Sequence, residues 1–106
     1  MKAPDFAFVA VQRLPNPEGS GFVPVVPDLV IETRSPGDSM ASVREKVQEW
    51  LDAGVRVVLA LDSVAQTVTV YRPASAGQIL TPSDTLAGLE VLPGFTLPLS
   101  RVFPTN

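Results

Sequence analysis

The chain has 106 residues, of which 45% are hydrophobic and 18% are charged. This length and composition are typical of one globular domain and exclude a disordered chain. Eight basic and eleven acidic residues give a net charge of −3, so the composition lacks the basic excess that strong nucleic-acid binders usually show. The chain contains no cysteine or histidine, which excludes disulfides, thiolate nucleophiles, serine–histidine catalysis and the usual zinc ligands.

The hydropathy pattern contains no apolar run of membrane-spanning length, and the first residues lack the apolar core of a signal peptide. The sequence therefore predicts a soluble, cytoplasmic protein without a membrane partner.

In chain order, apolar runs separated by turn residues predict one helix and several strands. The main elements are strands over 6–11 and 29–34, a helix over 39–53, and strands over 55–61 and 67–71. The strand over 55–61 is almost continuously apolar, which is typical of a strand buried on both faces, whereas 67–71 alternates and indicates an edge or half-exposed strand. Short strands are expected at 78–80 and 89–91. This order favours an α+β (mixed α/β) fold, a mixed sheet with one main helix.

The predicted helix has clear start and stop signals. Asp38 or Ser39 is a good N-cap, and Gly54 lies where a C-terminal glycine belongs. Apolar residues at helical spacing form one stripe that should face the sheet: Met40, Val43, Val47, Trp50 and Leu51. Trp50 is interpreted as a core residue.

Three acids lie at or inside the first two strands. Asp5 and Asp28 each follow a proline and open an apolar run, and Glu32 lies within the second run. A carboxylate is costly to bury unless a charged group meets it. Glu32 is therefore either half of a structural ion pair, with Arg34 or Lys46, or a metal ligand. The two aspartates could equally cap backbone N–H groups where the strands begin.

Antiparallel pairing of the first two strands would place Asp5 near Glu32 and leave Asp28 at the opposite end. Asp28 and Glu32 share a face but lie roughly 13 Å apart along a strand, which is too far to share one ion. Arg34 points to the face of Glu32, and Lys46 lies at the margin of the helix stripe, with its ammonium able to reach outward. Two acids and one lysine suit magnesium-assisted phosphodiester hydrolysis.

Pro4-Asp5, followed by Glu32-Thr33-Arg34, resembles the PD-(D/E)XK nuclease signature with arginine in the lysine position. A longer series of blocks resembles the Uma-type putative restriction endonuclease family; it comprises residues 27–32, 35–38, 45–47, 53–55, 67–73 and 92–95. The resemblance implies a restriction-endonuclease-like domain over 1–106, a site for Mg²⁺ or Mn²⁺, and a DNA substrate.

By position, the resemblance makes Asp5 and Glu32 metal ligands and Asp28 a further candidate ligand. Catalysis would rest on Asp5, Glu32, Lys46 and Arg34, with Lys46 in the lysine role if Arg34 does not take it. Arginine keeps its proton and cannot act as a base.

Members of this family carry an additional region before the first proline-aspartate strand, so the resemblance also implies a core shortened at its N-terminus. Two function classes follow. The first is a Mg²⁺-dependent DNA endonuclease, whose activity the shortening could abolish. The second is a non-catalytic module on the same scaffold that forms a homodimer or binds another partner, because a shortened sheet exposes an edge and apolar faces.

Overall fold

The computed structural model describes residues 6–9 and 26–103. The elements are, in chain order, β1 (Phe6–Phe8), β2 (Leu29–Arg34), α1 (Met40–Asp52), β3 (Val57–Asp62), β4 (Thr67–Tyr71), β5 (Gln78–Leu80), β6 (Thr85–Leu86), β7 (Leu97–Pro98) and the 3₁₀ helix η2 (Leu99–Arg101). No helix within the described ranges has the length and apolar character needed to cross a bilayer.

The main sheet has five strands in the order β1-β2-β3-β4-β5. β2 and β3 are parallel and are joined through α1, whereas the other neighbouring pairs are antiparallel. This mixed sheet with one main helix confirms the predicted α+β class. The predicted antiparallel pairing of the first two strands is also observed, with Phe6 opposite Ile31 and Phe8 opposite Leu29.

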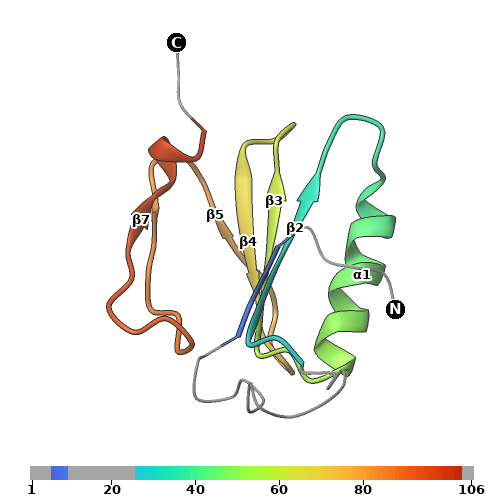
Figure 1. Cartoon of the computed structure of the whole chain (residues 1–106). Coiled ribbons are helices and arrows are strands. Elements are labelled where there is room, and N and C mark those ends of the chain that lie inside the picture. Colours follow the sequence, from blue (N-terminus) through green and yellow to red (C-terminus); the bar gives the residue numbers. More distant parts are fainter. Residues whose placement is uncertain (1–5, 10–25, 104–106) are drawn as a thin grey trace, which may run out of the picture.

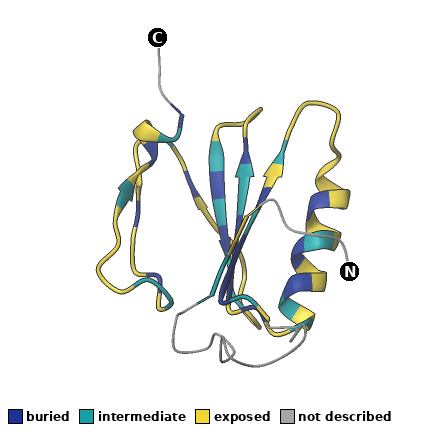
Figure 2. Cartoon of the chain, in the orientation of Figure 1, coloured by how far each residue is buried: buried dark blue, intermediate teal, exposed yellow. Residues whose placement is uncertain are grey.

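Figure 1 shows three layers, with α1 on one face of the sheet and the β6–β7 hairpin and η2 on the other. Side chains alternate between the two faces along each strand, so each face has its own core. Figure 2 shows buried positions along α1 on the side turned to the sheet. The α1-side core comprises Val30, Val43, Val47, Trp50, Val55 and Val58. The opposite core comprises Leu29, Val57, Leu59, Val68, Val70, Leu80, Leu86, Leu89, Leu99 and Phe103.

The helix begins and ends as its sequence predicts. The Ser39 side chain accepts a hydrogen bond from the Ser42 N–H, at 3.0 Å, which satisfies one of the free donors of the first turn. Gly54 follows the C-cap with a φ of +105°, a conformation that glycine adopts without steric cost.

Four details of the secondary structure differ from the sequence prediction. β3 spans Val57–Asp62 and not the predicted 55–61, because Val55 still belongs to the turn that ends the helix, where its N–H donates to the Trp50 carbonyl at 3.0 Å. Residues 89–91 form no strand. They lie in the loop that joins β6 to β7, and Leu89 packs into the core from this loop. β4 is half-exposed as predicted but is not an edge strand, since β5 pairs with its outer side. The described first strand ends at Phe8, and its predicted continuation over 10–11 lies outside the described residues.

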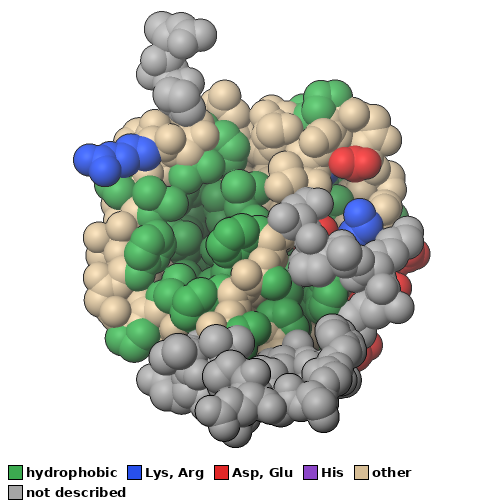
Figure 3. Space-filling model, in the orientation of Figure 1, with side chains coloured by type: hydrophobic (Ala, Val, Ile, Leu, Met, Phe, Trp, Pro, Cys, Tyr) green, Lys and Arg blue, Asp and Glu red, His purple; other side chains and the backbone are tan. Residues whose placement is uncertain are grey.

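The layer opposite α1 leaves part of the sheet open. A hollow of about 300 Å³ lies between β1, β2, β3 and the C-terminal layer, and all the described residues that line it are hydrophobic. Its lining includes two large side chains that remain accessible, Phe6 at 56% and Phe95 at 41% exposure. Figure 3 shows hydrophobic side chains gathered around a hollow on this face.

Candidate active site

Glu32 is a buried acid in the middle of the fold. It lies on β2, opposite Ala60 of β3, and only 3% of its surface is exposed. Glu32 lies two residues after Val30 on β2, so both side chains lie on the face of the sheet that packs against α1. The indole Nε1–H of Trp50 donates a hydrogen bond of 2.8 Å to its Oε1 atom. A carboxylate is thus held at the sheet–helix interface by a neutral donor.

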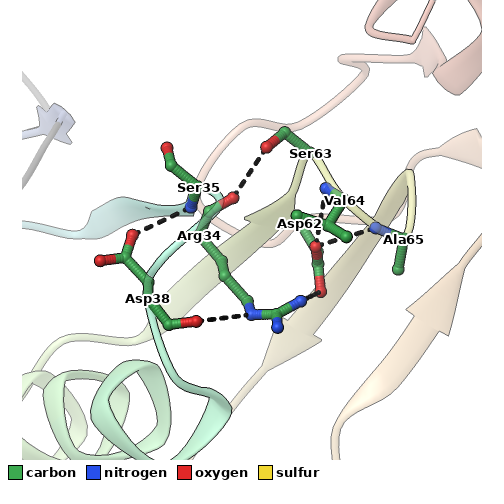
Figure 4. A network of polar contacts seen from close by, with 7 residues as sticks. All are labelled: Arg34, Ser35, Asp38, Asp62, Ser63, Val64 and Ala65. Carbon is green, nitrogen blue, oxygen red and sulfur yellow. Dashed lines mark hydrogen bonds and ion pairs between the residues drawn. The ribbon is translucent and has the colours of Figure 1, made fainter.

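Arg34 does not pair with Glu32. β2 and β3 end side by side, with Arg34 opposite Asp62, and the Nη1 atom of Arg34 lies 2.9 Å from Oδ2 of Asp62. The Nε atom of the same guanidinium donates to the backbone carbonyl of Asp38, at 3.2 Å. Figure 4 shows how these contacts tie the end of β2 to the turn after β3. The arginine that the sequence placed in the lysine position is therefore already bound within the strand ends.

Asp62 organises the turn that follows β3. Its Oδ1 atom accepts hydrogen bonds from the backbone N–H groups of Val64 and Ala65, both at 3.0 Å. The Ala65 N–H and the Arg34 side chain hold the pKa of Asp62 below its usual value, although burial acts in the opposite direction. Asp62 thus both stabilises the turn after β3 and provides the charged partner of Arg34 at the strand ends. Sequence reasoning did not identify this pair, because only the parallel register of β2 and β3 brings Arg34 opposite Asp62.

The structure places Asp28 at the other end of β2 from the Arg34 pair. It is buried, its backbone N–H donates to the Phe8 carbonyl at 2.8 Å, and its own carbonyl accepts from Val57 at 3.3 Å. Asp28 and Glu32 are four residues apart and lie on the same face of the sheet, the face covered by α1, with Val30 between them. This agrees with the expected separation of the two acids. Asp5 lies outside the described residues, so its approach to Glu32 stays a prediction.

Lys46 lies on α1, one turn before Trp50, and is half-buried. Residues four apart on a helix are neighbours on its surface, so Lys46 lies beside the side chain that contacts Glu32. Among the described residues, no ion pair joins Lys46 to Glu32. The predicted structural pairing of Glu32 with Arg34 or Lys46 is therefore not found in this part of the chain.

Within residues 6–9 and 26–103, no group of three or more acids is arranged to enclose a metal ion. The described part of the chain thus presents three buried acids in separate settings: Glu32, with a lysine on the adjoining helix, Asp28 at the other end of β2, and Asp62 in its pair with Arg34.

The model of the Uma2 family, described as "Putative restriction endonuclease", matches residues 1–100. The chain belongs to the Uma2 family. Its fold is similar to that in the crystal structure of "a putative nuclease belonging to DUF820" from Anabaena variabilis, with a TM-score of 0.77 and 25% identity. The match covers 96% of this chain and 59% of that protein, so the chain spans about three fifths of the relative's length. No curated protein matches the chain.

Proposed function

We propose that this Uma2 chain is a divalent-cation-dependent DNA endonuclease of the PD-(D/E)XK type, in which Glu32 binds the cation. The observation that carries the proposal is the environment of Glu32. Its carboxylate is almost fully buried, its hydrogen-bond donor is a neutral indole, and no cationic side chain of the described residues pairs with it. A buried charge in this state needs a positive partner. Membership of a family described as restriction endonucleases supports a cation and a DNA substrate.

The donor chemistry fits Mg²⁺ or Mn²⁺. Both are hard cations that bind carboxylate oxygens, and Mg²⁺ usually keeps several waters while using only one or two carboxylates. A site with few protein ligands is therefore compatible with Mg²⁺ even though the described residues hold no three-acid cluster. When bound, the ion would supply an activated water and charge stabilisation at the phosphate. We propose Asp5 as the second ligand, and Asp28 does not share the ion of Glu32.

The role of the positive side chain falls to Lys46 in this proposal. The guanidinium of Arg34 already contacts Asp62 and the Asp38 carbonyl, so its charge is largely engaged. Lys46 lies next to Trp50 on α1 and is partly accessible. Its ammonium can stabilise the charge that develops on the phosphate during cleavage.

Cation binding can be tested directly, because Trp50 is the only tryptophan in the chain and contacts Glu32. We expect Mn²⁺, a paramagnetic quencher, to quench the tryptophan emission saturably, and Mg²⁺ to compete with it. The Glu32→Gln variant should lose the saturable phase. Glu49→Gln is the matched control, since it makes the same charge change at an exposed position beside Trp50. Saturable quenching that is absent from the wild type, or intact in Glu32→Gln, would refute the metal site.

A second candidate function is a non-catalytic, self-associating module, and the apolar hollow opposite α1 favours it. The described residues that line the hollow are all hydrophobic. Beside it, β1 has a partner strand on one side only among the described strands. Edge strands and large apolar patches are commonly covered by association with another chain. A second copy could place its own β1 antiparallel to this edge and cover both hollows.

Association through this face predicts that the wild type sediments as a dimer and that Phe95→Glu sediments as a monomer. The new carboxylate would have to be buried in an apolar interface, which is unfavourable. Val64→Glu is the control, because Val64 is also an exposed hydrophobic residue, at 56%, but does not line the hollow. Sedimentation velocity at several concentrations measures the effect. A monomeric wild type, or a Phe95→Glu variant that still dimerises, would exclude this interface.

A further inference from the structure

The hydrogen bond between Trp50 and Glu32 links the helix to the proposed metal ligand. Trp50 belongs to the apolar stripe of α1 that packs on β2 and β3, and its indole ring is buried. Its Nε1–H nevertheless points at a carboxylate oxygen, at 2.8 Å, across the interface between the helix and the sheet. The position of α1 on the sheet therefore fixes the position of one oxygen of Glu32.

The chemistry of the indole makes this contact suited to orienting a ligand. Indole has one donor and no acceptor, so it can engage only one lone pair of one carboxylate oxygen. That contact restricts the rotation of the carboxylate, while Oε2 and the remaining lone pair of Oε1 stay available. The donor is also neutral. Unlike an arginine or lysine partner, it holds the carboxylate without neutralising the charge that would attract a cation.

We propose that Trp50 is a positioning residue for the cation site: its indole N–H fixes Glu32 in the orientation that binds the divalent ion. This inference rests on the proposed function, in which Glu32 is the metal ligand. It assigns Trp50 a role beyond the packing that its place in the helix stripe indicates. Loss of a hydrogen bond that orients a metal ligand typically lowers metal affinity about 10- to 100-fold.

The test is isothermal titration calorimetry of the full chain with Mn²⁺, well below the melting temperature of each variant. Trp50→Phe keeps an aromatic ring and removes the N–H donor. Replacement of Trp50 by 3-benzothienylalanine keeps the shape of the indole and replaces only the N–H by sulfur, so it isolates the hydrogen bond if Trp50→Phe fails to fold. Val47→Ala is the packing control, because Val47 lies in the same core and is not within the polar contact.

We expect both changes at Trp50 to weaken Mn²⁺ binding about tenfold or more, and Val47→Ala to leave the affinity unchanged while lowering the melting temperature. The chain should give a single indole N–H resonance in an NMR spectrum. We expect its chemical shift to differ between the wild type and Glu32→Gln, and to change when Mg²⁺ is added to the wild type. If the benzothienyl variant binds Mn²⁺ as tightly as the wild type while Glu32→Gln does not bind, Trp50 only packs and the inference fails. If the wild type and Glu32→Gln bind Mn²⁺ equally, the proposed function fails, and the inference fails with it.

Discussion

Glu32→Gln is expected to lower cation-dependent nicking of plasmid DNA by more than about a hundredfold. Changes that only reorient a metal ligand already cost about 10- to 100-fold, and this substitution removes the charge of the proposed ligand itself. The fold should persist, because glutamine keeps an oxygen that can accept the Trp50 hydrogen bond and no longer buries a charge. Thermal unfolding without added cation should therefore give a melting temperature equal to or above that of the wild type.

The paired measurement of nicking and melting temperature separates the proposed functions. Glu49→Gln is the control for the charge change, and the wild type with a chelator is the control for the cation. Lys46→Gln should slow nicking without changing Mn²⁺ affinity, because the ammonium acts on charge that develops in the reaction. Cleavage that survives Glu32→Gln would contradict the assigned ligand. A wild type that neither nicks DNA nor binds Mn²⁺ would favour the non-catalytic module.

Leu99→Ala is expected to lower the free energy of unfolding by about 2–5 kcal/mol, the usual cost of removing a buried leucine side chain. Leu99 has no exposed surface and lies in the core opposite α1, and its backbone N–H donates to the Asp84 carbonyl at 2.9 Å. It therefore joins η2 to the loop before β6. Because small domains are stable by only about 5–15 kcal/mol, this loss should be visible as a large shift of the urea midpoint.

Ile79→Ala is the matched control for Leu99→Ala, since it also removes an aliphatic side chain but from a position that is 65% exposed. It should change stability by no more than about 0.5 kcal/mol. Equal effects of the two substitutions would mean that the C-terminal layer does not unfold cooperatively with the sheet.

The central part of the fold could be predicted from sequence because its signals are local. The helix bounds follow from the Ser39 cap and Gly54, and β2, β4 and β5 have the predicted limits. The hairpin of β6 and β7 could not be predicted, since each strand has only two residues and its pairing depends on tertiary contacts. Leu89 and Val91 pack on the core from a loop while Glu90 between them is exposed, an alternation that periodicity cannot distinguish from a short strand.

The candidate site was predicted less completely than the fold. The burial of Glu32 followed from its position inside an apolar run, but its contact with Trp50 joins residues on different elements, and no local pattern indicates it. The partner of Arg34 was also missed. The pairing with Asp62 depends on the parallel register of β2 and β3, which the sequence alone did not specify. Asp5, on which the two-ligand prediction depends, lies outside the described residues.

Among the described residues, the two cores share no member. Glu32, Trp50 and Lys46 belong to the face covered by α1, whereas the hollow and the C-terminal layer belong to the other face. Substitutions on one face reach the other only through the strand backbones. During divergence of the family, we therefore expect the residues that line the hollow to change readily among relatives that retain Glu32 and Trp50.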